Sequence, residues 1–137
     1  MIYVDILRRG RNDRADRFCL AGRFNGAGGA GGPISKLTVK GHAGYAPKGE
    51  DIVCAAASVT AYTAAGALNE LCGAPLDCAM EKEGFLEIAV PVFDDADIAY
   101  RADIIMETAC IGFRQIEASY GGFIKVRERP SKILGEK

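Results

Sequence analysis

The chain of 137 residues contains no tryptophan, one histidine and five cysteines. The cysteines include no CxxC pair, and with a single imidazole they do not make the usual zinc ligand sets. An odd number of cysteines without a regular framework also argues against a disulfide scaffold. We therefore expect reduced thiols, no metal and no cofactor. Four of the cysteines are interpreted as structural or incidental: Cys19, Cys72, Cys78 and Cys110.

Two further absences concern location and partners. The sequence has no recognisable signal peptide and no apolar run that we interpret as membrane-spanning, which predicts a cytoplasmic protein without a membrane partner. The net charge of −1 gives no reason to expect direct nucleic-acid binding. Basic residues are nevertheless concentrated before the glycine run: Arg8, Arg9, Arg11, Arg14, Arg17 and Arg23. We interpret them as a solvated hairpin tip, with contact to RNA or an acidic partner as the alternative.

Length and composition predict one domain over residues 1–137. A hydrophobic content of 49% and a charged content of 26% are typical of a globular protein of this size. Glycines 26, 28 and 31 formally satisfy GxGxxG, but Pro33 and a strand-like segment follow where a dinucleotide site needs a helix. We interpret residues 8–33 as a hairpin connection that carries a glycine-rich insertion of roughly twenty residues.

Periodicity predicts five strands and two helices in the order ββαββαβ. The strands are expected over 2–7, 34–39, 76–81, 85–90 and 123–126, with a hairpin turn at 82–84. One helix is expected over 52–71, and another follows the aspartates at 94–97, with an apolar stripe of Ile98, Ala102, Ile105, Ala109, Phe113 and Ile116. Two helices on one face of a mixed sheet make a two-layer α+β domain. The tail that contains Pro130 is expected to add nothing to the core.

The first helix is expected to begin after Asp51 or Glu50 as its N-cap and to end before Gly73. Its packed face is predicted to hold Ile52, Val53, Ala56, Val59 and Thr60.

The segment GHAGYAPKGEDIVCAAAS, residues 41–58, carries the candidate chemistry. It places His42 twelve residues before Cys54, which lies in the first turn of that helix. A helix N-terminus and a nearby imidazole favour the thiolate form of cysteine, and the first-turn amides could donate to a developing oxyanion. The alternatives are a cysteine packed at a close helix contact and a solvated loop histidine.

In residue type, order and spacing, GHAGYA followed by GEDIVCAA resembles the signature of the ribosomal-processing cysteine protease family, Prp. The resemblance implies that His42 and Cys54 are the catalytic pair and that Gly41, Asp51 and Ser58 support them. Gly41 would allow the turn that aims the imidazole. Asp51 would cap the helix or orient His42, and Ser58 would position the substrate or the thiolate. In that family the histidine lies much nearer the N-terminus, after a short hairpin. Here an inserted connection precedes it.

The resemblance further implies a homodimeric cysteine endopeptidase that removes a short N-terminal extension from large-subunit ribosomal protein twenty-seven, with that precursor as its partner. Two alternatives stay open. One is a cysteine hydrolase of another peptide, and the other is a noncatalytic ribosome-associated binding factor.

Overall fold

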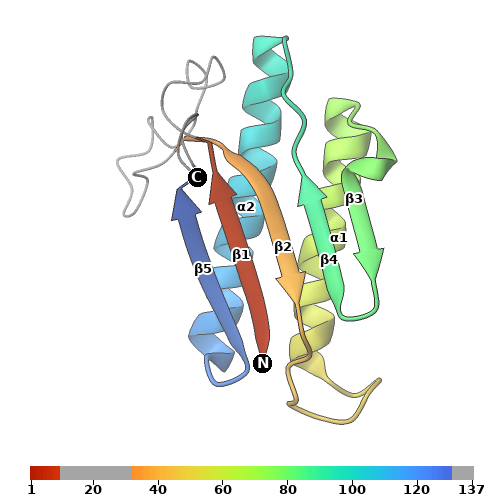
Figure 1. Cartoon of the computed structure of the whole chain (residues 1–137), viewed down its shortest axis with the longest axis vertical. Coiled ribbons are helices and arrows are strands. Elements are labelled where there is room, and N and C mark those ends of the chain that lie inside the picture. The colour runs from red at the N-terminus through yellow and green to blue at the C-terminus, as the bar shows by residue number, and fades with distance from the viewer. Residues whose placement is uncertain (10–31, 131–137) are drawn as a thin grey trace, which may run out of the picture.

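The computed structural model describes residues 1–9 and 32–130 (Figure 1). Its strands are β1 (Ile2–Arg8), β2 (Ile34–Lys40), β3 (Ala79–Lys82), β4 (Phe85–Ala89) and β5 (Ile124–Pro130). The helices are α1 (Ile52–Cys72), α2 (Ala96–Tyr120) and the short 3₁₀ helix η3 (Leu76–Cys78). The predicted order ββαββαβ and the α+β class are confirmed.

The five strands form one mixed sheet in the spatial order β3-β4-β2-β1-β5. Neighbours pair antiparallel except β1 and β5, which run parallel, with Ile2 opposite Ile124 and Arg8 opposite Pro130. The first strand therefore lies inside the sheet, between β2 and β5, and the last described strand forms an edge.

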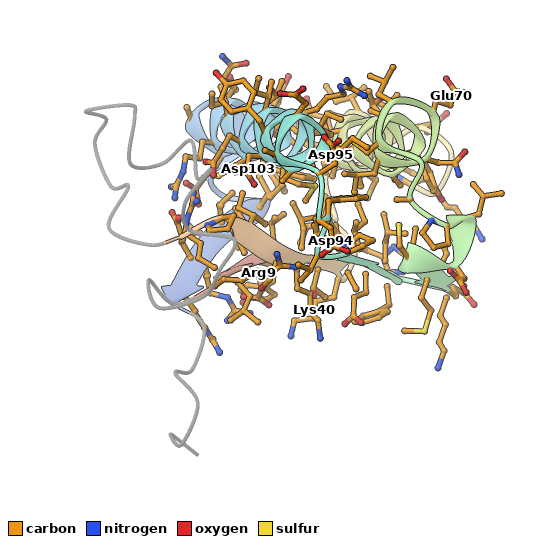
Figure 2. All side chains as sticks on the ribbon, turned by 90° about the horizontal axis from the view of Figure 1, so that it is seen from above. Arg9, Lys40, Glu70, Asp94, Asp95 and Asp103 are labelled. Carbon is orange, nitrogen blue, oxygen red and sulfur yellow. The ribbon has the colours of Figure 1, made fainter. Side chains whose placement is uncertain are left out.

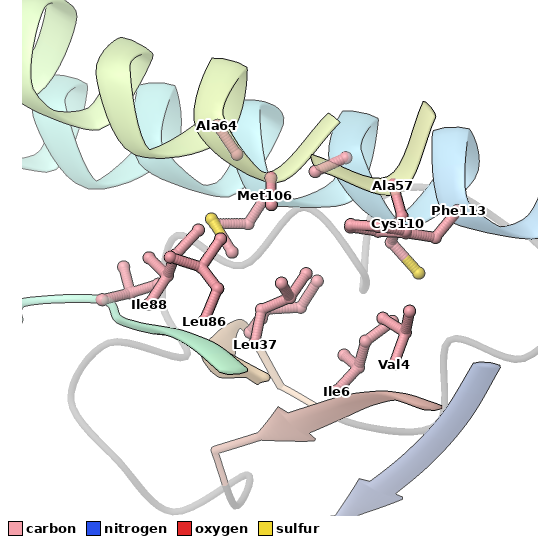
Figure 3. Packing of buried hydrophobic residues seen from close by; sticks show 14 of the residues in the cluster. Val4, Ile6, Leu37, Ala57, Ala64, Leu86, Ile88, Met106, Cys110 and Phe113 are labelled. Carbon is pink, nitrogen blue, oxygen red and sulfur yellow. The ribbon is translucent and has the colours of Figure 1, made fainter. Parts of the chain in front are cut away.

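Both long helices cover the same face of the sheet. Seen from above, they make one layer, and Lys40 projects from the opposite face of the sheet (Figure 2). Between the layers, Phe113, Met106 and Cys110 of α2 pack against Val4, Ile6 and Leu37 of the sheet (Figure 3). Because both layers contribute apolar side chains to this one cluster, burial of this surface holds the helices on the sheet.

The face that α1 buries differs in part from the predicted one. Val53 is buried as predicted, but Ile52 and Val59 are 50% and 61% exposed. Half of the residues that α1 buries are alanines: Val53, Ala57, Ala61, Ala64, Leu68 and Cys72. Small side chains allow the helix to lie close to its neighbours. They also give little apolar contrast, which is why periodicity favoured the bulkier wrong face.

The ends of α1 are as predicted. Asp51 is the N-cap, and Gly73 at φ +72° is the left-handed C-cap. By length and composition α1 could also cross a membrane, with a mean hydropathy of 1.4, so this helix departs from the expectation of no apolar run of spanning length. Core helices of soluble proteins pass the same test, and α1 buries one face in the core described above.

Two other boundaries differ from expectation. Residues 76–78, predicted as strand, form η3, and β3 begins only at Ala79. The expected last strand over 123–126 is too short, because β5 pairs with β1 as far as Pro130. The segment that we expected to be a polar tail therefore completes the sheet as far as residue 130.

Arg8 is also not part of a solvated tip. Its side chain turns toward the helices and is 6% exposed. The guanidinium donates to both oxygens of Glu107 on α2, at 2.6 and 2.9 Å, and to Glu128 on β5. Arg114 contacts the other oxygen of Glu128 at 2.5 Å. Burial alone would lower the pKa of Arg8, but the two carboxylates outweigh it and raise that pKa.

The predicted insertion lies largely in residues 10–31, outside the described residues. Its described neighbours are joined directly, since the Gly32 N–H donates to the Arg9 carbonyl at 3.1 Å and the Arg9 N–H donates to the Pro33 carbonyl at 2.9 Å. This junction follows the Arg8 end of β1, at the opposite end of the sheet from the Lys40 end of β2 (Figure 1).

Candidate active site

The β2–α1 loop, the N-terminal end of α1 and the β3–β4 turn meet at one end of the domain (Figure 1). A pocket of about 140 Å³ opens there. Its lining includes four of the predicted site residues, Gly41, His42, Cys54 and Ser58. The structure therefore brings the single histidine and the first-turn cysteine to one pocket.

Asp51 does not line this pocket but organises its edge. One carboxylate oxygen accepts from the amides of Val53 and Cys54, each at 3.0 Å, and the other accepts from Tyr45 at 3.0 Å and Ala46 at 3.4 Å. Burial alone would raise the pKa of Asp51, but these N–H donors outweigh it and lower the pKa. Asp51 thus caps α1 and ties the preceding loop to it.

Cys54 is half-buried, and its sulfur accepts a hydrogen bond of 3.3 Å from the Ala43 amide. This donor belongs to the loop, not to the helix. The first-turn amides that we expected to face an oxyanion are occupied instead, because Val53 and Cys54 both donate to Asp51. In this conformation the loop amide at Ala43 is the backbone donor aimed at the sulfur.

His42 lies against the β3–β4 turn. A Cβ added to Gly84, whose φ is +68°, would stand 3.2 Å from the imidazole Nε2. The neighbouring backbone is fixed by a 2.9 Å hydrogen bond from the Gly41 amide to the Gly84 carbonyl. Gly41 itself has φ +95°, and a Cβ there would stand 2.4 Å from the Met1 carbonyl oxygen, so only glycine fits.

Tyr45 anchors the middle of the loop. Its ring makes edge contacts with Tyr120 at 5.7 Å and Phe123 at 5.1 Å between centroids. Aromatic contacts of this geometry are stabilising. Together with the Asp51 bonds, they hold the loop that carries His42 to α1, to the last residue of α2 and to the residue before β5.

Sequence reasoning missed the far side of the pocket. Tyr62 of α1 and Glu81 of β3 both line it, and the Tyr62 hydroxyl donates to Glu81 at 2.5 Å. The spacing of Cys54, Ser58 and Tyr62, four residues apart, was the available signal, because such residues share one face of a helix. The strand partner could not be found without the fold.

Within residues 1–9 and 32–130, no group of three histidine, cysteine or acidic side chains could hold a metal ion. Cys72, Cys78 and Cys110 are free thiols whose pKa burial raises. A raised pKa disfavours the thiolate, so these three are poor candidates for a nucleophile.

Comparisons with known proteins agree on one family. Residues 28–125 match the family model of cysteine protease Prp. The ribosomal processing cysteine protease Prp of Bacillus subtilis (strain 168) is 28% identical over 94 residues, which make up 68% of this chain and 84% of that protein.

Solved structures share the fold. The ribosomal processing protease Prp from S. aureus with a covalently linked product peptide has a TM-score of 0.68 and 22% identity, covering 94% of this chain and 100% of that one. The same protease with a substrate peptide has a TM-score of 0.65 and 23% identity, with the same coverage. SMU.848 from Streptococcus mutans has a TM-score of 0.63 and 20% identity, covering 96% of each chain.

Proposed function

This chain belongs to the Prp family of cysteine proteases, and we propose that it cleaves peptide bonds with Cys54 as nucleophile and His42 as its base. One observation carries the assignment. His42 and Cys54 line a single pocket, and the sulfur there accepts an N–H from the residue that follows the histidine.

In the proposed mechanism, His42 takes the proton of Cys54, and the thiolate attacks the scissile carbonyl carbon. The protonated imidazole then gives this proton to the leaving amine, and water releases the acyl group from sulfur. The Ala43 amide, which contacts the resting sulfur, is the backbone donor that we propose for the charge that develops during attack. Asp51 holds this amide in place indirectly, through its bonds to Tyr45 and Ala46.

We propose a ribosomal protein precursor as the substrate. The Bacillus subtilis relative is named a ribosomal processing protease, and the S. aureus relative was solved with a substrate peptide. The finer proposal is the one that the sequence signature implies, removal of a short extension from the N-terminus of large-subunit ribosomal protein twenty-seven, after a phenylalanine.

The test is incubation of that precursor, from the same organism, with the wild type, Cys54→Ala and His42→Ala. We expect cleavage by the wild type and loss of at least about a hundredfold in kcat/KM for each variant. Cys78→Ala is the matched control, because Cys78 is also a half-buried free thiol but lies outside the pocket. Equal cleavage by all four proteins would contradict the Cys54–His42 assignment.

A second arm tests the substrate. We expect the precursor to be cut far faster than a scrambled extension of the same composition. Equal rates with both would favour the alternative of a cysteine hydrolase with other peptide substrates.

The homodimer and the cytoplasmic location stay proposals. We place the dimer interface on the apolar groove between α1 and α2, where Val59 and Ile104 are 61% and 42% exposed. Light scattering of the wild type and of Val59→Glu tests it, with a shift toward monomer expected for the variant.

A further inference from the structure

The hydrogen bond between Tyr62 and Glu81 crosses from α1 to the edge strand β3 at the pocket. Both residues line the pocket that holds Cys54 and His42. They take no part in the mechanism above, since neither has a described contact with the thiol or the imidazole. Because they line the pocket, their role is one other than the chemical step.

The strand register places Glu81 on the inner face of the sheet. Glu81 lies opposite Leu86, which is buried beneath the helices. Tyr62 follows Cys54 by eight residues along the same helix, which is about 12 Å of axial distance. An extended peptide covers about 3.3 Å per residue, so Tyr62 lies about three or four residues along a bound substrate from the reacting sulfur.

The chemistry of the pair is that of an anionic acceptor. Tyr62 donates to one carboxylate oxygen, and no described residue in 1–9 or 32–130 donates to the other. The hydrogen bond to Glu81, with some burial, raises the pKa of the Tyr62 phenol, so the phenol remains the donor near neutral pH. The pocket lining also includes the apolar side chains of Ala57, Ala61 and Leu86, together with Lys82, which follows Glu81 on β3. A carboxylate beside such apolar side chains suits the aliphatic stem and charged head of lysine or arginine.

We propose that Tyr62 and Glu81 form a specificity subsite for a lysine or arginine side chain of the substrate, about three or four residues from the scissile bond. This inference rests on the proposed function. The Glu81 carboxylate receives the cation, and Tyr62 fixes the orientation of that carboxylate. The subsite selects among peptides and leaves the chemistry at Cys54 unchanged.

The experiment compares peptides that differ only in lysine, norleucine or glutamate at the third or fourth position on either side of the cut. With the wild type we expect lysine to exceed glutamate by at least about tenfold in kcat/KM at one of these positions, the gain typical of a charge-assisted hydrogen bond. Glu81→Lys should invert this preference, and Tyr62→Phe should weaken it.

Glu83→Lys is the matched control, because Glu83 is an exposed neighbour in the turn that does not line the pocket. This variant should keep the wild-type preference. An unchanged lysine-to-glutamate ratio in Glu81→Lys would overturn the subsite.

A binding measurement separates the two proposals. Fluorescence polarisation monitors how the same peptides bind to variants that also carry Cys54→Ala. If the wild type cleaves no peptide but Glu81→Lys still inverts the order of dissociation constants, the proposed function fails and the subsite stands. If the wild type cleaves the peptides but Glu81→Lys leaves the order of dissociation constants unchanged, the subsite fails and the proposed function stands.

Discussion

The carboxylate of Asp51 accepts the backbone N–H of Cys54 at 3.0 Å, so the residue that caps the helix also occupies an amide beside the nucleophile. The second carboxylate oxygen accepts from Tyr45 and Ala46 in the histidine loop. One side chain thus fixes both segments that line the proposed active site.

Asp51→Asn should separate these two tasks. Asparagine is a good N-cap and can still accept from the helix amides. Its NH₂ group would then face the amides of Tyr45 and Ala46, where a donor meets donors. We expect α1 to remain folded while kcat/KM falls by about tenfold or more, measured beside far-ultraviolet circular dichroism. Full activity in this variant would show that the loop does not need the carboxylate.

The same substitution carries a pH signature. Because the folded pKa of Asp51 is lowered, its ionised form stabilises the fold at pH values above the unfolded pKa of about 3.9. That contribution is lost as the pH falls through the lower, folded pKa. We expect the difference in unfolding free energy between wild type and Asp51→Asn, from urea titrations, to be constant near pH 6–7 and to shrink below about pH 4.

Gly84→Ala should displace the imidazole of His42. The new methyl would stand 3.2 Å from Nε2, and the residue would keep a φ of +68°. Gly73→Ala is the matched control, with φ +72° and no atom within 4 Å of the added carbon. Each variant should lose about 1–2 kcal/mol of stability from the left-handed backbone. Only Gly84→Ala should also lower kcat/KM, and equal kinetics of the two would contradict this placement of His42.

Residues 10–31 should be replaceable by an Asn-Gly turn. Arg9 and Gly32 are already joined by a backbone hydrogen bond, as the flanks of a tight hairpin are. Their junction lies at the end of the sheet away from the pocket, so we expect cleavage within about threefold of the wild type. A shortened protein that folds but no longer cleaves would assign the replaced segment a part in substrate recognition.

Arg8→Ala should be strongly destabilising, by about 3 kcal/mol, because it leaves Glu107 and Glu128 without their buried cation. Lys36→Ala is the control. The Lys36–Glu87 pair spans 3.9 Å, and the lysine side chain is 44% exposed, so we expect a loss below about 0.5 kcal/mol. Chemical denaturation of both variants measures the difference, and similar losses would contradict the structural role of Arg8.

Local signals predicted much of this fold. Asp51 and Gly73 bound α1 because capping chemistry depends on a few adjacent residues. The aspartates at 94–97 likewise predicted the start of α2, whose N-cap is Asp95. The signature around His42 and Cys54 predicted that both residues would serve one site, and they line one pocket.

The errors have non-local causes. Which face of α1 is buried depends on how closely alanines let the helix approach its neighbours. The polar stretch after Val126 becomes strand because β1, at the other end of the chain, supplies its pairing partner, and because Glu128 meets Arg8 there. No window of sequence contains both members of such a pair.

The pairing of β1 with β5 has a consequence for synthesis. Arg8 and Glu128 lie 120 residues apart, so on a translating ribosome the first strand waits on the order of ten seconds for its parallel neighbour to be made. During that interval the edge of β1 that later pairs with β5 stays unpaired, and the sheet is incomplete. The enzyme should therefore acquire its final structure only after release of β5 from the exit tunnel, and ribosome-bound chains that stop before Ile124 should be open to proteolysis.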